Sequence, residues 1–464
     1  MTDWNPVARL RARSSRETDV VPLGVATRAW FAVSLQTFGG PAGQIAVMHR
    51  ELVAERRWIG ERRFLHALSY CTLLPGPEAQ QLAIYVGWLL NGTLGGLIAG
   101  VLFVLPGYLA IMGLSVMYAG WGDTLAVEAL FAGVAPAVLA IVAHAVVRVS
   151  KRALTNRVLI ALAVASFVAL ALFAVPFPIV LAVAALAGYL LGRSRPDRFE
   201  VADHGDADPD AAPPLIADDA LHDERRSFRR SAGMLAVGLT LWCLPVALLA
   251  LVFGRSSIFV EQGTFFGGTA LITFGGAYAV LGYVAQRAVE TYGWLGPGDM
   301  VTGLAMAETT PGPLIMVVQF VGFMGAYNSP GDLNPWVAGV LAATVVTWVT
   351  FVPCFLFIYL GAPHVEALRH NRRLADALTG ITAAVVGIIA NLGLYFAIHV
   401  LFDDVEERSF GPIHVDAPEL DSFDPLAAGV AVLAFILIFR RNWNVLSTLG
   451  LCAVVGATAH VLTV

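Results

Sequence analysis

Two short motifs place glycine and proline inside apolar stretches, and the chemistry they offer is that of exposed backbone N–H groups. Gly39-Gly40-Pro41 and Pro75-Gly76-Pro77 each interrupt an apolar run. Proline removes a backbone donor and disfavours helix in the residue before it, while glycine permits a turn. A helix that begins after such a break presents free N–H groups at its positive end. Such helix ends bind anions, so each motif predicts an anion contact.

Both motifs return later in the chain at one spacing. Thr37-Phe38-Gly39-Gly40 recurs as Thr273-Phe274-Gly275-Gly276, and Pro75-Gly76-Pro77 recurs as Pro311-Gly312-Pro313, in each case 236 residues later. The chain is therefore predicted to contain two related halves. Four helix ends, two from each half, would converge near the membrane midplane and hold a small tetrahedral dianion without a buried lysine.

The predicted anion-binding residues are those of the breaks and the neighbouring hydroxyl and amide donors. They are Thr37, Gly39, Gly40, Pro41, Gln44, Pro75, Gly76, Pro77, Gln80 and Gln81 in the first half, and Thr273, Gly275, Gly276, Thr309, Thr310, Pro311, Gly312 and Pro313 in the second. The alternative is that glycine and proline only permit kinks and close helix packing, which membrane helices often use.

Two glutamates lie in or beside the breaks and are candidates for proton coupling. Ionisable residues at membrane depth are rare and usually functional, which favours this role for Glu78 and Glu308. Glu78 can instead serve as a helix cap, since a carboxylate is stabilised at a helix N-terminus. A basic stretch between the motifs can steer anions or can act only as a topology signal and lipid contact. Its arginines are Arg50, Arg56, Arg57, Arg62 and Arg63.

The composition requires a membrane around these motifs. Of 464 residues, 57% are hydrophobic and only 14% are charged, with a mean hydropathy of +0.72, whereas soluble domains carry about a quarter charged residues. Many apolar runs reach the roughly 20 residues that cross a bilayer. The four cysteines are scattered and no nucleotide-binding signature occurs, so no metal, cofactor or nucleic-acid partner is expected. Membrane lipids are expected partners, and a homodimer is left open.

The chain divides into five predicted segments. A basic tail over 1–23 lacks an apolar run and is expected to stay in the cytoplasm. Membrane repeats over 24–192 and 254–464 flank a solvated cytoplasmic linker over 193–230 and a connecting transmembrane helix over 231–253. The expected location is the inner, or plasma, membrane. The single connecting span would turn the second half upside down.

The charges of the loops predict which side of the membrane each loop faces, because basic loops favour the cytoplasm. The loop with Arg148 and Arg152 is expected inside, and the acidic loop over 403–424 is expected outside. The arginines of 49–63 would lie outside if the flanking segments each crossed the bilayer, against this rule. Re-entrant or broken helical hairpins keep that stretch inside. The sequence thus predicts an all-α polytopic membrane protein with two homologous halves in an inverted-topology repeat, each with two such hairpins plus transmembrane helices.

At these motifs the chain resembles the long, two-domain form of the chromate ion transporter family. The resemblance rests on Thr37-Phe38-Gly39-Gly40-Pro41, Leu74-Pro75-Gly76-Pro77, Gln80-Gln81 and Phe103-Val104-Leu105-Pro106, and it spans both halves. It implies secondary active export of chromate, with sulfate as a related dianion, driven by the proton motive force.

Three rival functions are weighed against this one. A membrane-embedded lipid-phosphate flippase or enzyme would need a compact group of acids and arginines in the breaks, and the breaks contain no arginine. A passive anion channel needs no coupling group. The sequence favours a transporter over an enzyme.

Overall fold

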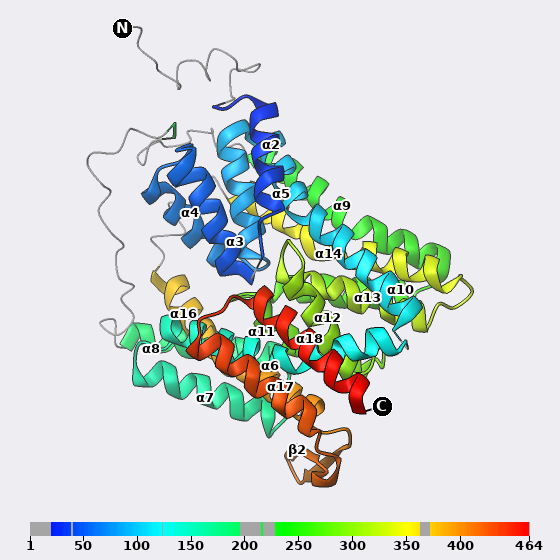
Figure 1. The fold of residues 1–464 in the computed structure, drawn as a ribbon. Coiled ribbons are helices and arrows are strands. Elements are labelled where there is room, and N and C mark those ends of the chain that lie inside the picture. The colour runs from blue at the N-terminus through cyan, green and yellow to red at the C-terminus, as the bar shows by residue number, and fades with distance from the viewer. Residues whose placement is uncertain are drawn as a thin grey trace, which may run out of the picture.

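The computed structural model describes residues 20–38, 40–122, 124–194, 215–216, 228–361 and 372–463. Within these ranges the chain is helical apart from one β-hairpin and the connecting turns. By length and composition, six of the described helices are long and apolar enough to cross a membrane. Figure 1 shows long helices packed side by side, with shorter helices among them. The prediction of an all-α polytopic membrane protein is confirmed.

The first half begins with short helices and continues with long ones. The short ones are α2 (Leu23–Ser34), α3 (Gly40–His49), the π-helix η1 (Arg50–Glu55) and α4 (Glu61–Thr72). They are followed by α5 (Glu78–Trp121), α6 (Leu125–Ala153), α7 (Arg157–Ala171) and α8 (Phe177–Ser194). Helix α5 kinks at Asn91 and Gly92, where glycine takes a left-handed φ of +62°.

The second half follows the same succession. Its elements are α10 (Ile258–Leu271), α11 (Ala277–Gln286), η3 (Arg287–Thr291), α12 (Pro297–Thr309), η4 (Leu314–Met316), α13 (Val317–Asn328), α14 (Pro335–Gly361), α16 (Arg372–Leu401), η6 (Leu420–Ser422), α17 (Pro425–Phe435), η7 (Ile436–Arg440) and α18 (Val445–Thr463). The kink in α5 corresponds to a complete break in the second half, where α13 ends and α14 begins as a separate helix. Polar residues of the loop 329–334 explain the interruption.

The halves interlock through their long helices. Helix α6 packs against α17 and α18 of the other half, and α16 packs against α7 and α8. The contacts use glycine: Gly133 of α6 meets the backbone at Cys452, and Gly380 of α16 meets the backbone at Ala184, with no room for a Cβ at either position. Small residues allow membrane helices to approach closely. Each half therefore completes the packing of the other.

Two strands interrupt the helical pattern after α16. Strands β1 (Val405–Phe410) and β2 (Ile413–Pro418) form an antiparallel hairpin. The hairpin is anchored where the backbone N–H of His414 donates to the carbonyl of Leu172, 2.8 Å away, at the end of α7. The sequence predicts only an acidic loop in this stretch.

Most of the predicted tail and linker lies outside the described residues, namely 1–19, 195–214 and 217–227. Between residues 195 and 227, two residues of the linker are described, Leu215 and Ile216. The backbone N–H of Ile216 donates to the carbonyl of Trp58 at 3.0 Å, and Gly60 donates to the carbonyl of Ile216 at 3.1 Å. The connecting helix α9 (Phe228–Phe253) follows the linker and has no counterpart among the described residues of the first half.

Candidate anion site

The helices are interrupted at all four motifs, as predicted. In the first half, α2 ends at Ser34 before α3 begins at Gly40, and α4 ends at Thr72 before α5 begins at Glu78. The second half has matching interruptions over 272–276 and 310–313. Three of the four breaks lead directly into an α-helix. The fourth, Pro311-Gly312-Pro313, leads first into the 3-10 turn η4, so its helix end is less regular than predicted.

Backbone hydrogen bonds join the breaks of opposite halves. The N–H of Gly76 donates to the carbonyl of Thr273 at 2.8 Å, and the N–H of Gly312 donates to the carbonyl of Thr37 at 2.9 Å. The two bonds are equivalent under the 236-residue spacing. The Pro-Gly-Pro break of each half therefore lies against the glycine-rich break of the other half.

Glycine is required at both Pro-Gly-Pro breaks. The φ angles of Gly76 and Gly312 are +114° and +107°, a region that other residues rarely adopt. A Cβ on Gly312 would lie 3.2 Å from Cα of Gly107 in α5, and a Cβ on Gly76 would lie 2.9 Å from Sγ of Cys354 in α14. Gly40, Gly275 and Gly276 also have positive φ, whereas Gly39 lies outside the described residues. The backbone conformation of these glycines thus helps to shape the breaks.

Most of the predicted side-chain donors already donate within the protein. The hydroxyls of Thr37, Thr273, Thr309 and Thr310 donate to the carbonyls of Ser34, Thr269, Met306 and Ala307, three or four residues earlier. The amide nitrogens of Gln44 and Gln81 donate to the carbonyls of Gly312 and Pro75, both at 2.6 Å. These side chains hold the breaks in shape, and in this conformation they offer few free donors to a ligand.

Gln80 is the exception among the predicted donors. Its side chain is completely buried at the start of α5, and neither amide atom has a hydrogen-bond partner among the described residues. An unpaired buried amide costs about 1–3 kcal/mol. Its position, three residues after Pro77, places a donor beside the break. Of the predicted glutamine and threonine side chains, Gln80 is the one best placed to bind a ligand.

The two glutamates occupy different environments. Glu78 is the first residue of α5, with Pro77 as its N-cap, where a carboxylate is stabilised. Glu308 is buried near the C-terminal end of α12 and accepts a hydrogen bond from the hydroxyl of Tyr278 in α11. Positions 42 and 72, which correspond to Tyr278 and Glu308, hold Ala42 and Thr72. Tyr278 and Glu308 therefore both differ from their counterparts in the first half. This common difference could have identified Tyr278 from the sequence, but the motif analysis missed it.

Arginines from a distant part of the chain act electrostatically on both glutamates. Arg148 of α6 interacts electrostatically with Glu308, and Arg152 interacts electrostatically with Glu78. Nη2 of Arg148 lies 3.4 Å from Nδ1 of His144, and its Nε is buried without a partner among the described residues. The breaks contain no arginine, but the fold supplies positive charge beside them. Sequence spacing gave no indication of this arrangement.

Only some arginines of the basic stretch at 50–63 are free to attract an anion toward the protein. Arg56 lies 3.2 Å from the carboxylate of Glu51 and stacks over Trp58. Arg50 lies 3.5 Å from the carboxylate of Glu55. Arg63 is buried, and its Nη2 lies 3.4 Å from the hydroxyl of Tyr85. Arg57 and Arg62 are exposed. A steering role remains a prediction, and these two arginines are the best placed for it.

The sequence profile of one protein family matches both halves, over residues 26–189 and 260–457, and that family is the chromate transporters. This chain belongs to the chromate transporter family. It is similar to a chromate transport protein of Pseudomonas aeruginosa, with 34% identity over 80% of this chain and 81% of the relative. A chromate transport protein of Cupriavidus metallidurans is 30% identical over 79% of this chain and 80% of its own length.

A more distant relative is the probable chromate transport protein of Synechococcus elongatus, which is 27% identical over 76% of this chain and 79% of its own length. No solved structure matches this chain significantly. The family supports a role in chromate transport.

Proposed function

We propose that this protein is a secondary active transporter that exports chromate, with sulfate as a second substrate, using the proton motive force. Family membership supports chromate as the substrate, because two relatives with at least 30% identity over most of the chain are named chromate transport proteins. The names of these relatives also favour a transporter over a lipid-phosphate enzyme. We propose the plasma membrane as its location, with the N-terminus in the cytoplasm.

The reciprocal hydrogen bonds between breaks are the single observation that carries the proposed site. They bring Gly76 and Gly312 to the junction of the halves, where backbone N–H groups and the Gln80 amide can face an anion. Backbone donors at helix ends bind tetrahedral oxyanions without a full counter-charge. Arg148 and Arg152 add positive potential nearby. The proposed site therefore attracts a dianion without holding it by a tight ion pair.

The proposed coupling uses Glu78 and Glu308. An ionised Glu78 competes with the substrate for the same positive helix end, because like charges about 4 Å apart repel by about 4 kcal/mol at an effective dielectric of 20. Protonation removes this repulsion. Binding of a proton and binding of the anion then favour each other, as reciprocal linkage requires. A chromate dianion that leaves with one proton carries one net negative charge outward, so the inside-negative membrane potential, the electrical part of the proton motive force, drives its export.

Uptake of labelled chromate and sulfate into everted vesicles tests this function. We expect uptake to rise when a proton motive force with a positive vesicle lumen is imposed, and to fall to the level of vesicles without the protein when a protonophore is added. Gradient-independent flux that follows only the anion concentration would indicate the alternative, a passive channel. Uptake of neither anion would overturn the substrate assignment.

A further inference from the structure

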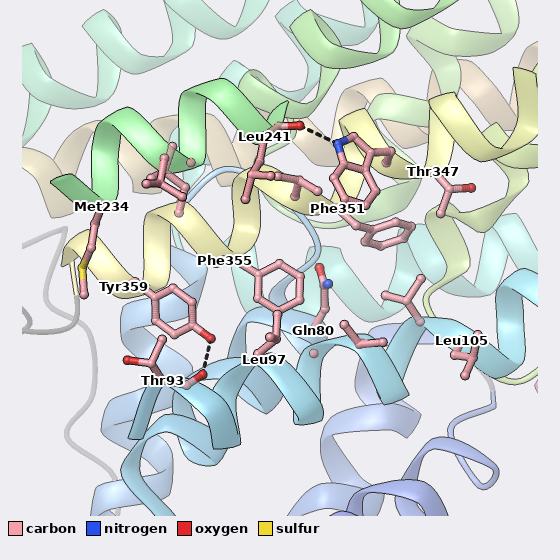
Figure 2. A pocket seen from close by; sticks show the side chains of 18 of the residues that line it. Gln80, Thr93, Leu97, Leu105, Met234, Leu241, Thr347, Phe351, Phe355 and Tyr359 are labelled. Atoms are coloured by element: carbon pink, nitrogen blue, oxygen red, sulfur yellow. Dashed lines mark hydrogen bonds between the residues drawn. The ribbon is translucent and has the colours of Figure 1, made fainter. Parts of the chain in front are cut away.

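A long apolar groove lies between three candidate membrane helices, α5, α9 and α14. Its cavity volume is about 940 Å³. Figure 2 shows Leu97 of α5 and Phe351 and Phe355 of α14 facing into it, among aliphatic and aromatic neighbours. The groove is separate from the helix breaks except at its inner end.

Tyrosines tie α5 to α14 at both ends of the groove. The hydroxyl of Tyr359 donates to the carbonyl of Thr93 at 2.9 Å, and the hydroxyl of Tyr108 lies 2.8 Å from Oγ1 of Thr344. The first of these hydrogen bonds is visible in Figure 2. Because the two bridges lie 15 residues apart along α5, they set the length of the groove.

Helix α9 forms the opposite wall and packs against α14 and α10. None of its most apolar window, within 231–253, is buried. It is attached to α14 by two tryptophans: Nε1 of Trp348 donates to the carbonyl of Leu241 at 2.7 Å, and Nε1 of Trp242 donates to the carbonyl of Val349 at 2.9 Å. The protein thus fixes a helix at a distance from α5 and leaves the space between them open.

The surroundings of the groove indicate what fills it. All three of its walls are candidate membrane spans, so the groove opens toward the hydrocarbon of the bilayer. The lining side chains of Leu97, Val101 and Leu105 are exposed on α5, and an apolar occupant is needed to cover them. We propose that the groove binds an acyl chain of a membrane phospholipid. An extended chain is apolar and narrow, and it gains dispersion contacts with both walls and with the aromatic floor.

The bound chain also affects Gln80. This buried amide lines the inner end of the groove and has no hydrogen-bond partner among the described residues. In Figure 2 it lies beside Phe355. An acyl chain above it separates the amide from the bilayer, so that the amide faces the polar backbone of the break beside Pro77. The lipid thereby forms one wall of the space next to the helix break.

Native mass spectrometry of the purified full chain tests this inference without any transport assay. The probe is a phosphatidylethanolamine with dibrominated acyl chains, whose mass distinguishes it from lipid retained during purification. Val237→Phe places a larger side chain in the groove from an exposed position on α9. Val252→Phe is the matched control, because Val252 is exposed on the same helix and does not line the groove.

We expect the parent and Val252→Phe to bind one tightly held lipid that Val237→Phe binds at least tenfold more weakly, with unchanged thermal unfolding in all three. Equal lipid binding by the two variants would overturn the inference. A dimer of the parent that dissociates in Val237→Phe would also overturn it, because the occupant would then be a second copy of this chain. Either outcome is independent of whether chromate is transported.

Discussion

At the scale of single residues, the conformation of Gly312 is the most constrained feature of the site. Gly312→Ala puts a Cβ at a φ of +107° and 3.2 Å from Gly107. The strain should cost about 1–3 kcal/mol, and transport should fall about tenfold or more because the Gly312 N–H would move away from the Thr37 carbonyl. Chromate uptake and thermal unfolding of the purified protein measure the two effects.

The control for this variant is Gly113→Ala. Gly113 lies in α5 without a positive φ, and a Cβ added there would meet no atom within 4 Å. Alanine there should stabilise the helix by about 1 kcal/mol or less and leave transport unchanged. Parent-like transport by Gly312→Ala would remove the break from the mechanism.

A substitution of the single residue Glu78 tests the proposed coupling of proton binding to anion binding. Glu78→Gln resembles the protonated side chain permanently, so the variant should bind its anion at least as tightly as the parent. Its affinity should not change between about pH 5 and pH 8, whereas that of the parent should rise as the pH falls. Proton-driven uptake should be largely lost. Binding of sulfate to purified protein across this pH range is the measurement, because sulfate stays a dianion there, whereas chromate itself takes up a proton.

Glu55→Gln, on the exposed end of η1, controls for a general change of charge. If Glu78→Gln and the parent give parallel curves of affinity against pH, Glu78 is only a helix cap.

The breaks could be predicted from sequence because glycine and proline act through local backbone geometry. The roles of the side chains around them could not. Thr37 and Gln44 are reasonable donors by residue type, but their hydrogen atoms point to backbone carbonyls that the fold brings close. Which donors remain free depends on contacts between residues far apart in the chain, and residue type alone does not determine them.

At the scale of elements, the orientation of the two π-helices η1 and η3 decides whether the repeat is inverted. Glu55 and Thr291 are exposed near their ends. Cysteines introduced at these positions, in a background without the native cysteines, should react with a membrane-impermeant reagent from opposite sides of the membrane. Labelling of both from one side would contradict the inverted topology.

Asp416 in the β-hairpin is expected to lower the free energy of unfolding as the pH rises. Burial raises the pKa of Asp416, with His399 opposing the effect and Glu407 adding to it, and Glu407 is its partner across the strands. An acid whose pKa is higher in the folded state destabilises that state once the pH exceeds the ordinary value. Asp416→Asn should therefore raise the melting temperature by about 1–3 °C at about pH 8 and leave it unchanged at about pH 3.

Asp421→Asn, at an exposed acid in η6, provides the comparison for this variant. A gain in melting temperature that is the same at both pH values would show that the carboxylate of Asp416 is not the cause.

Elements that depend on local signals were the easiest to predict. The helix breaks and the apolar spans follow from residue type and run length, whereas the approach of Arg148 to Glu308 depends on how α6 crosses α12. The sequence identifies Arg148 and Arg152 only as part of a basic loop. Helix crossing depends on glycine contacts such as that of Gly133, which have no readable pattern in a single sequence.

At the scale of the whole molecule, the interlocking of α6 and α16 predicts that neither half is stable alone. Residues 1–204 and 205–464, expressed together as two chains, should copurify and transport chromate, because the helices that join the halves are intact. Each fragment expressed alone should be degraded or aggregate, since its long helix lacks the partners that cover it. A stable, monodisperse first half would contradict this.

The reciprocal hydrogen bonds between Gly76 and Thr273 and between Gly312 and Thr37 have an evolutionary consequence. Two identical half-length chains, each offering one glycine N–H and one threonine carbonyl, would close the same pair of bonds. Joining the copies in one gene removes the requirement that they stay alike. Tyr278 and Glu308, whose counterparts are Ala42 and Thr72, then mark one half as chemically different while the backbone bonds of the two halves stay equivalent.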